Sequence, residues 1–204
     1  MKVVVGLSGG VDSTVTAMLL KEAGHDVTGI TMKIWKDGRY KGGTKDACLS
    51  PRENDDVAKT KQLCESIGIT HYDFDCSDEY EKVVIENFRQ EYLAGNTPNP
   101  CVRCNSFMKF GVLPNLARKA GLEFEKFATG HYARIEQNEA GRYLLSVAAD
   151  KTKDQSYFLY RLNQQQLATL MLPLGNLTKA EVRDYARKAQ LAVSDKPDSQ
   201  DFYS

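Results

Sequence analysis

The sequence predicts an α/β protein, a doubly wound parallel sheet with helices on both faces. Two observations lead to this fold class. Apolar strand-like runs alternate with segments of helical period, which is the pattern of successive strand–helix–strand units. The chain also has 204 residues with a hydrophobic fraction of 42%, which is enough for one ordinary hydrophobic core.

The first half of the chain supplies most of the expected elements. We expect strands over residues 3–5, 27–32, 69–74 and 126–129. In the first helix, apolar residues recur every three to four positions from Val11 to Leu19, and Gly24 stands where a C-terminal cap belongs. Two further helices are expected over residues 52–67 and 78–93, and the polar, Gly- and Lys-rich stretch 36–50 is expected to be a mobile loop.

The later part of the chain changes in pattern. Residues 132–147 alternate around a turn at 138–141, which predicts a β-hairpin that extends the sheet or forms a rim. Thr178 and Glu181 have the spacing of a capping box and predict a helix over residues 178–190, followed by a loop. The fold prediction therefore includes an added hairpin and C-terminal helices.

Charge and cysteine content restrict the class of protein. The 27 basic and 27 acidic residues cancel, so a nucleic-acid partner would have to be recognised by a local patch. No stretch approaches the roughly 20 apolar residues of a membrane span, and the chain starts with a strand instead of a signal peptide, so we expect a cytoplasmic protein. The five cysteines favour thiol or metal chemistry over a secreted disulfide framework.

The stretch GLSGGVDS, residues 6–13, lies between the first strand and the first helix. Such a turn presents backbone N–H groups and the positive end of a helix to an anion, and Gly9 and Gly10 permit close approach. The hydroxyls of Ser8 and Ser13 can bind phosphate, and Asp12 can cap the helix or hold a phosphate-bound Mg²⁺. The sequence is neither a Walker A loop nor a dinucleotide fingerprint. The alternative is a tight turn with a good cap.

Six segments together carry a resemblance to a known family. The first, SGGVDS at residues 8–13, resembles the pyrophosphate loop of N-type ATP pyrophosphatases. Five later segments resemble the tRNA-specific 2-thiouridylases and occur in that family's order: NTPNP with Cys104-Asn105, ATGHYAR at 128–134, KDQSYFL at 153–159, LPLG at 172–175 with Lys179, and DSQ at 198–200.

The resemblance implies an adenine nucleotide α-hydrolase fold and ATP-dependent thiolation of the wobble uridine of tRNA at C2. ATP would adenylate the uridine O2, and a sulfur nucleophile would then displace AMP. Carried over by position, the expected ATP-binding residues are Gly6, Leu7, Ser8, Gly9, Gly10, Val11, Asp12, Ser13, Met32 and Gly130. The residues expected near the target base or tRNA are Asn99, Pro100, His131, Lys153, Asp154 and Gln155. The expected catalytic residues are Cys104, Cys101 and Asp12.

Several of these residues have ordinary structural alternatives. Met32 ends an apolar strand and can be a core residue. His131 can be a hydrogen-bonded histidine at a strand end, and residues 153–155 can be a solvated turn. Gln200 can be a surface amide.

The chain departs from the family's commonest pattern at two positions. Cys101 stands where an Asp is usual, which creates a Cys-x-x-Cys with Cys104, and Tyr203 stands where a second catalytic Cys is usual. Our leading hypothesis is a [4Fe-4S] cluster held by Cys48, Cys101 and Cys104, with one iron open to hydrosulfide. The alternatives are a Cys101/Cys104 persulfide and disulfide pair, or a structural zinc. We expect Cys64 and Cys76 to be buried or incidental thiols.

The domain organisation follows from the same resemblance. We assign residues 1–150 to the ATP-binding catalytic domain and 151–204 to a helical extension that begins the family's central domain. The family's C-terminal β-barrel is expected to be absent from this chain. The two interpretations are a truncated chain and a missing part that is supplied elsewhere, and both predict weaker tRNA binding than in the longer architecture. The expected partners are tRNA and a sulfur donor, either a protein relay or sulfide. Two competing functions are an adenylating synthetase acting on a small molecule and a non-enzymatic nucleotide- or RNA-binding module.

Overall fold

The computed structural model describes residues 1–36 and 52–194. Its strands are β1 (Lys2–Gly6), β2 (Asp26–Lys33), β3 (Thr70–Asp75), β4 (Lys126–Ala128), β5 (Arg134–Gln137), β6 (Tyr143–Ser146) and β7 (Leu170–Met171). Its α-helices are α1 (Val11–Glu22), α2 (Glu53–Ser66), α3 (Ser77–Tyr80), α4 (Glu86–Leu93), α5 (Pro100–Arg103), α6 (Leu113–Lys119), α7 (Gln164–Thr169) and α8 (Lys179–Lys188). The remaining helical segments are the π-helical η1 (Glu81–Ile85) and η2 (Cys104–Val112) and the 3₁₀ turns η3 (Ser156–Leu159) and η4 (Pro173–Asn176).

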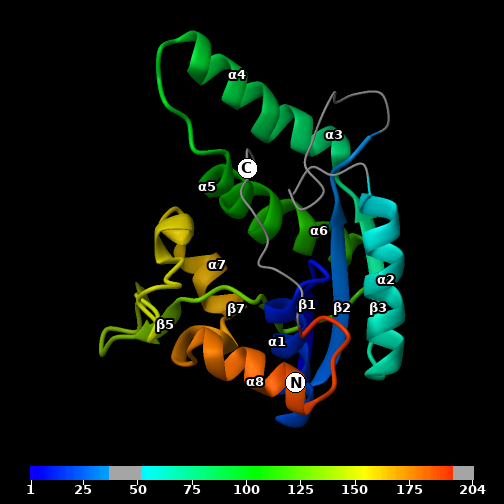
Figure 1. Ribbon diagram of the computed structural model, residues 1–204. Helices are drawn as coiled ribbons and strands as arrows, with labels where there is room; N and C mark the ends of the chain where they lie inside the picture. The colour runs from blue at the N-terminus through cyan, green and yellow to red at the C-terminus, as the bar shows by residue number, and fades with distance from the viewer. Residues whose placement is uncertain (37–51, 195–204) are drawn as a thin grey trace.

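Within the described residues, five parallel strands form one sheet in the order β3-β2-β1-β4-β7. The chain moves outward from β1 to β3 and then returns to the other side of β1, so the strand order reverses between β1 and β4. Ligands of doubly wound sheets bind at the carboxyl ends of the strands beside such a reversal. The predicted fold class is confirmed (Figure 1).

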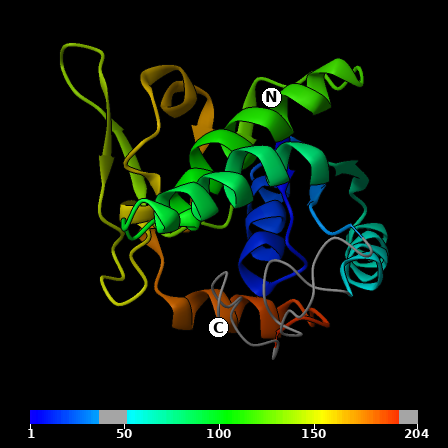
Figure 2. The same cartoon turned by 90° about the horizontal axis from the view of Figure 1, so that it is seen from above.

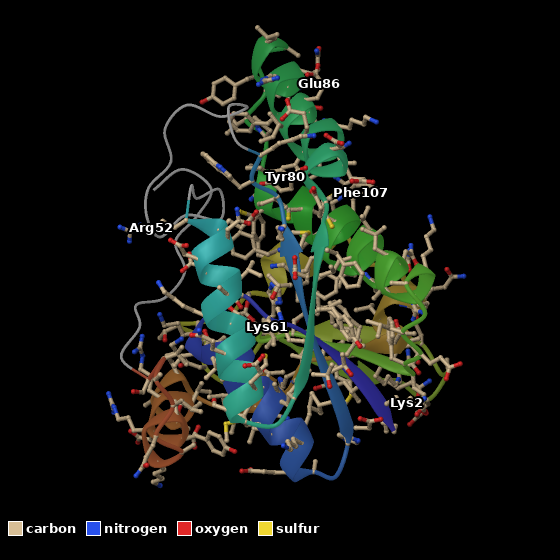
Figure 3. All side chains as sticks on the ribbon, turned by 90° about the vertical axis from the view of Figure 1, so that its right-hand side faces the viewer. Lys2, Arg52, Lys61, Tyr80, Glu86 and Phe107 are labelled. Carbon is tan, nitrogen blue, oxygen red and sulfur yellow. The ribbon has the colours of Figure 1, made fainter. Side chains whose placement is uncertain are left out.

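Two layers of helices cover the sheet, as Figure 2 shows from above. Helices α1 and α2 bury Ala17, Leu20 and Cys64 against one face, which includes Val3 and Val5. The segments from α3 to α7 cover the opposite face with a second core. Figure 3 shows this separation, with Lys61 labelled on α2 and Phe107 on η2 across the strands.

The four predicted strands and the helix starting at Val11 are confirmed, as is Gly24, which follows that helix at φ +80°. The predicted hairpin is present as β5 and β6, a separate two-stranded sheet. The capping box predicted from Thr178 and Glu181 begins α8, and its two reciprocal hydrogen bonds are both present. The predicted loop over residues 36–50 falls, apart from its first residue, outside the described part of the chain.

Sequence reasoning missed the helical run from Pro100 to Lys119, which contains Pro114. A proline has no N–H group and therefore leaves the carbonyl of the residue four positions earlier without its helical donor. That residue is Phe110, whose carbonyl accepts a 3.0 Å hydrogen bond from Gln166 Nε2; the same amide donates to the Ser106 carbonyl at 2.9 Å. The side chain from α7 replaces the missing backbone bond and allows the run to continue.

No helix in the described part of the chain is long and apolar enough to cross a membrane.

Candidate functional site

The Gly-rich stretch 6–13 forms a tight connection between β1 and α1 at the carboxyl edge of the sheet. Thr31 Oγ1 donates a 3.0 Å hydrogen bond to the Leu7 carbonyl and holds the start of the loop. Within the loop, Ser13 Oγ accepts a 3.2 Å bond from the Ser8 amide. Gly9 has φ +70°, and a Cβ there would lie 2.5 Å from Thr60 Oγ1 on α2. Both its backbone conformation and its surroundings therefore require glycine.

The start of α1 has the features of an anion site. Gly10 is the N-cap and supplies no side-chain hydrogen bond, so no cap side chain covers the first N–H groups of this 12-residue helix. The helix dipole adds a positive partial charge at the same point. Gly130, after β4, approaches closely, because a Cβ there would lie 2.8 Å from the Asp12 carbonyl carbon and the Ser13 nitrogen. The loops after β1 and β4 thus meet where the strand order reverses.

Asp12 is not a helix cap in this structure. Lys179 Nζ lies 2.8 Å from Asp12 Oδ1 and 2.7 Å from Oδ2, and the Tyr132 hydroxyl donates a 2.8 Å bond to Oδ1. The side chains of Lys179 and Asp12 are 11% and 30% exposed, so the pair is largely shielded from water. It joins α8 to the first turn of α1 across 167 positions of sequence.

Residues of the segments 128–134, 153–159 and 172–175 position the tyrosine that bonds the Asp12 carboxylate. Tyr132 is 2% exposed, its amide donates to Gln155 Oε1 at 3.0 Å, and its carbonyl accepts from the Gln155 amide at 2.7 Å. Gly175 packs directly on Ala133, the residue that follows Tyr132, since a Cβ at Gly175 would lie 2.1 Å from the Ala133 carbonyl oxygen. Three motifs that are distant in sequence therefore hold the Tyr132 ring and its hydroxyl at Asp12. Sequence reasoning assigned no role to Tyr132 or Lys179.

Met32 and His131 lie near the same sheet edge with different surroundings. Met32, the penultimate residue of β2, is partly buried and packs on the core, so its proposed nucleotide contact and its structural alternative both remain. His131 Nδ1 lies 2.8 Å from Thr129 Oγ1, and its ring is 5.6 Å from that of Phe110. Burial, together with the ammonium of Lys109, holds the pKa of His131 well below its usual value, so the imidazole is neutral at pH 7.

Cys101 and Cys104 lie where α5 passes into the π-helical η2. Asn99 is the N-cap of α5, with its side chain accepting a 3.0 Å bond from the Val102 amide, and Pro100 occupies the first helical position. Both cysteines are of intermediate exposure. This segment therefore presents two thiols one helical turn apart, and π-helical turns are frequent at functional sites.

A third thiol lies close to this pair. Cys76 follows β3 at the same sheet edge, is fully buried, and belongs to the core on which Cys104 packs. Burial raises the pKa of Cys76 to about 12, with smaller contributions from nearby acidic residues and Cys104. Cys64 is 1% exposed and burial raises its pKa to about 11. The prediction that Cys64 and Cys76 are buried thiols is confirmed, and neither is a reactive thiolate at neutral pH.

The proposed metal site is only partly within the described residues. Cys48, the third predicted ligand, lies outside them, as do Asp198, Gln200 and Tyr203. Among the residues that the structure describes, no group of three or more His, Cys, Asp or Glu side chains is placed to hold a metal ion. The two thiols of Cys101 and Cys104 fit part of a cluster site.

The predicted tRNA contacts at residues 153–155 differ in exposure and in structural role. Lys153 is exposed. Asp154 accepts 2.7 Å bonds from the Ala148 amide and from Ser156 Oγ, and Gln155 supports Tyr132. The structural role of Asp154 and Gln155 is therefore evident in the fold itself, while an RNA contact for this segment stays a prediction.

Curated proteins resemble this chain over its whole length. It is 52% identical over 206 residues to the tRNA-specific 2-thiouridylase MnmA of Endomicrobium trichonymphae, with 100% of this chain and 57% of that protein covered. The match to the MnmA of Geotalea uraniireducens is 47% identical over 204 residues, covering 98% and 53% of the two chains. The chain thus spans about half the length of the curated relatives it matches.

Solved structures share the fold at low sequence identity. An NMN synthetase from Francisella tularensis aligns with a TM-score of 0.53 and 18% identity, covering 97% of this chain and 65% of that one. A 4-thiouridine synthetase, solved with RNA and ATP, aligns with a TM-score of 0.54 and 16% identity, covering 96% and 42%. A family model described as "tRNA methyl transferase HUP domain" matches residues 1–203, and the chain therefore belongs to this family.

Proposed function

We propose that this chain is the ATP-binding catalytic part of a tRNA-uridine 2-sulfurtransferase. The observation that carries the proposal is the arrangement at one sheet edge. There an uncapped helix start, closely approached by Gly130, can bind phosphates, and the Cys101/Cys104 segment lies beside Cys76 at the end of β3. The relatives named 2-thiouridylases, at 46–52% identity, support the reaction class and the tRNA substrate.

The first step of the proposed reaction is adenylation. The uridine O2 attacks the α-phosphorus of ATP, pyrophosphate leaves, and AMP becomes bonded to O2. The first-turn N–H groups of α1 and the backbone at Gly9 and Gly10 stabilise the charge on the phosphates. Lys179 and Tyr132 fix Asp12 and hence the turn. Because Lys179 already pairs with Asp12, a Mg²⁺ ion would share this carboxylate with it.

The second step replaces oxygen by sulfur. A sulfur nucleophile attacks C2 of the adenylated uridine, the C2–O2 bond breaks, and AMP leaves with its oxygen. In the leading proposal Cys101, Cys104 and Cys48 would hold a [4Fe-4S] cluster, and its chemistry would be to bind and deliver hydrosulfide.

The second proposed route uses the two thiols alone. In this route the donor is a protein persulfide, which transfers its outer sulfur to Cys104 and is left as a thiol. The outer sulfur of the Cys104 persulfide attacks C2 and AMP leaves, and the Cys101 thiolate then attacks Cys104 Sγ. This forms a Cys101–Cys104 disulfide, releases the 2-thiouridine, and leaves a disulfide for a cellular dithiol to reduce.

The remaining parts of the proposal follow from the same family. Asn99 and Pro100 lie at the target base, and His131 and Lys153 contact tRNA. Residues 1–150 form the catalytic domain, while 151–204 lead into the central domain; β7 and α8 from this second segment pack with β4 and α1. The proposed protein works in the cytoplasm with tRNA and a sulfur donor.

The experiment combines AMP formation with metal analysis. Anaerobically purified protein is assayed for iron, acid-labile sulfide and AMP release from ATP, with and without unmodified tRNA. We expect AMP release that requires tRNA and is abolished in a Gly9→Val variant. ATP turnover that proceeds equally without RNA would refute the proposal and favour a small-molecule synthetase.

The metal analysis decides between the two sulfur routes. Iron and sulfide at the level of one cluster, lost in Cys101→Ala and in Cys48→Ala, supports the cluster route. Absence of iron after anaerobic reconstitution supports the persulfide pair. Cluster-level iron that persists in Cys48→Ala contradicts the assignment of that third ligand.

A further inference from the structure

An exposed group of aromatic and cationic side chains lies beside the Cys101/Cys104 segment. Phe107 on η2 is 42% exposed, and Tyr157 and Tyr160, in and just after η3, are 63% and 62% exposed. Turn η3 packs against both α5 and η2, and Figure 1 shows this yellow segment next to α5. We call Phe107, Tyr157, Tyr160, Arg103 and Arg161 the aromatic platform. A protein in water gains nothing by exposing three such rings together, so the platform requires an explanation.

The rings and guanidinium groups are already arranged relative to one another. Arg103 and Arg161 place their guanidinium carbons 5.0 and 5.6 Å from the centroid of the Phe107 ring. The Tyr157 and Tyr160 rings have centroids 5.9 Å apart. The Arg103 Nε also donates to the Val83 carbonyl, which anchors this side chain on η1. These contacts limit the rotamers of the platform before any ligand binds.

This combination fits unpaired nucleobases joined by phosphates. Exposed aromatic rings and the guanidinium planes of arginine both stack on bases of any sequence, and arginine also interacts with phosphate charge. A protein partner would also bury rings, but two cationic groups next to three rings match a polyanion with flat side groups better.

We propose that the aromatic platform stacks unpaired bases of a single-stranded RNA loop, next to the base that enters the thiol site. This inference deepens the proposed function and rests on it for the identity of the RNA. It assigns binding roles to Phe107, Tyr157 and Tyr160, none of which the sequence motifs marked as RNA contacts. An enzyme that acts on a base must take that base out of its stack, and a platform that holds the neighbouring bases lowers the cost of doing so.

The test measures binding of a fluorescein-labelled RNA stem-loop with a seven-base loop to the full chain by fluorescence anisotropy. Loss of one base stack weakens single-stranded RNA binding by about 5- to 150-fold. We expect Tyr157→Ala/Tyr160→Ala to weaken binding at least about tenfold, and the matched double Phe variant to stay within about twofold. Tyr92→Ala is the control, because Tyr92 on α4 is also 63% exposed and lies outside the platform.

A second measurement does not depend on how the variants fold. Wild-type protein is titrated with the same stem-loop carrying abasic loop positions, and with the stem duplex alone. We expect the abasic loop to bind the wild type as weakly as the intact loop binds the double Ala variant. Equal binding of intact and abasic loops overturns the proposal. So does a double Ala variant, shown by circular dichroism to be folded, that binds the intact loop as tightly as the wild type.

These outcomes separate this inference from the proposed function. If wild-type protein releases AMP in a tRNA-dependent reaction but the Tyr157 and Tyr160 variants bind RNA normally, the proposed function stands and the platform does not. If no RNA stimulates AMP release while stem-loop binding still depends on the two tyrosines, the platform stands and the proposed reaction fails. The inference is also overturned if the rings of the aromatic platform bind a protein partner while the Tyr157 and Tyr160 variants keep their RNA binding.

Discussion

Replacing Lys179 by methionine tests the link between α8 and the phosphate loop. The change removes an ammonium that contacts both oxygens of Asp12, at 2.8 and 2.7 Å, while it keeps most of the side-chain volume. The Asp12 carboxylate would then retain the Tyr132 hydroxyl and the positive end of α1.

The magnitude follows from burial. Removing one partner of a fully buried ion pair costs about 3–5 kcal/mol in the free energy of unfolding. The Lys179 side chain is 11% exposed but that of Asp12 is 30% exposed, and the helix start offsets part of the loss. We therefore expect a loss of roughly 2–3 kcal/mol, or about 4–12 °C in melting temperature.

The assay is urea denaturation at pH 7, with the variants Asp12→Asn and Asp12→Asn/Lys179→Met completing a double-mutant cycle. We expect the double variant to be more stable than Lys179→Met alone, since no unpaired carboxylate remains. Lys188→Met, at an exposed position of the same helix, is the control and should change stability by less than about 0.5 kcal/mol. A Lys179→Met effect no larger than this control, or strict additivity in the cycle, would refute the reasoning.

Three further predictions concern the site and its surroundings. Gly130→Ala should weaken ATP binding severely, because its Cβ would overlap the backbone of the first turn of α1. Isothermal titration calorimetry measures this loss. The control is Gly111→Ala, whose added Cβ would have its nearest contact at 3.6 Å and which should bind ATP normally. Burial lowers the pKa of His131, so as the pH falls below about 6.5 the histidine takes up a proton in the unfolded chain but not in the folded protein. The free energy of unfolding should therefore decrease by up to about 1.4 kcal/mol for each pH unit of acidification. Comparison of urea curves should show that His131→Gln lacks this slope. In reduced, metal-free protein, iodoacetamide at pH 8 followed by peptide mass spectrometry should modify Cys101 and Cys104 but leave Cys64 and Cys76 intact. Rapid labelling of Cys76 in folded protein would contradict its burial.

Local patterns in the sequence were sufficient for the elements with a strong period. The strands around Val4 and Ile30 and the capping box at Thr178 depend on neighbours in sequence, and all three are confirmed. Strand β7 has only two residues and gives no periodic signal. In the helical run through Pro114, the carbonyl that the proline leaves without a helical donor accepts a hydrogen bond from Gln166, more than 50 positions away in sequence.

The site was predictable to the extent that backbone requirements define it. Gly9 is constrained by its turn and Gly130 by its close approach to α1. Each lies in a sequence motif, and the motif was enough to predict it as a site residue. The partners of Asp12 were not predictable, because Tyr132 and Lys179 are 120 and 167 positions distant and meet it only through the tertiary fold. The exposure of Tyr157 and Tyr160 likewise depends on how η3 packs, since aromatic residues in a sequence are more often part of a core.

The most direct measurement of the central proposal follows the oxygen of the target base. Unmodified tRNA carrying oxygen-18 at the uridine O2 is incubated with the protein, ATP and a sulfur source, and the AMP and nucleosides are examined by mass spectrometry. Adenylation of O2 predicts 2-thiouridine at the wobble position and one labelled oxygen in AMP for each thiolation. Thiolated tRNA accompanied by unlabelled AMP, or AMP formation without 2-thiouridine, would contradict the account.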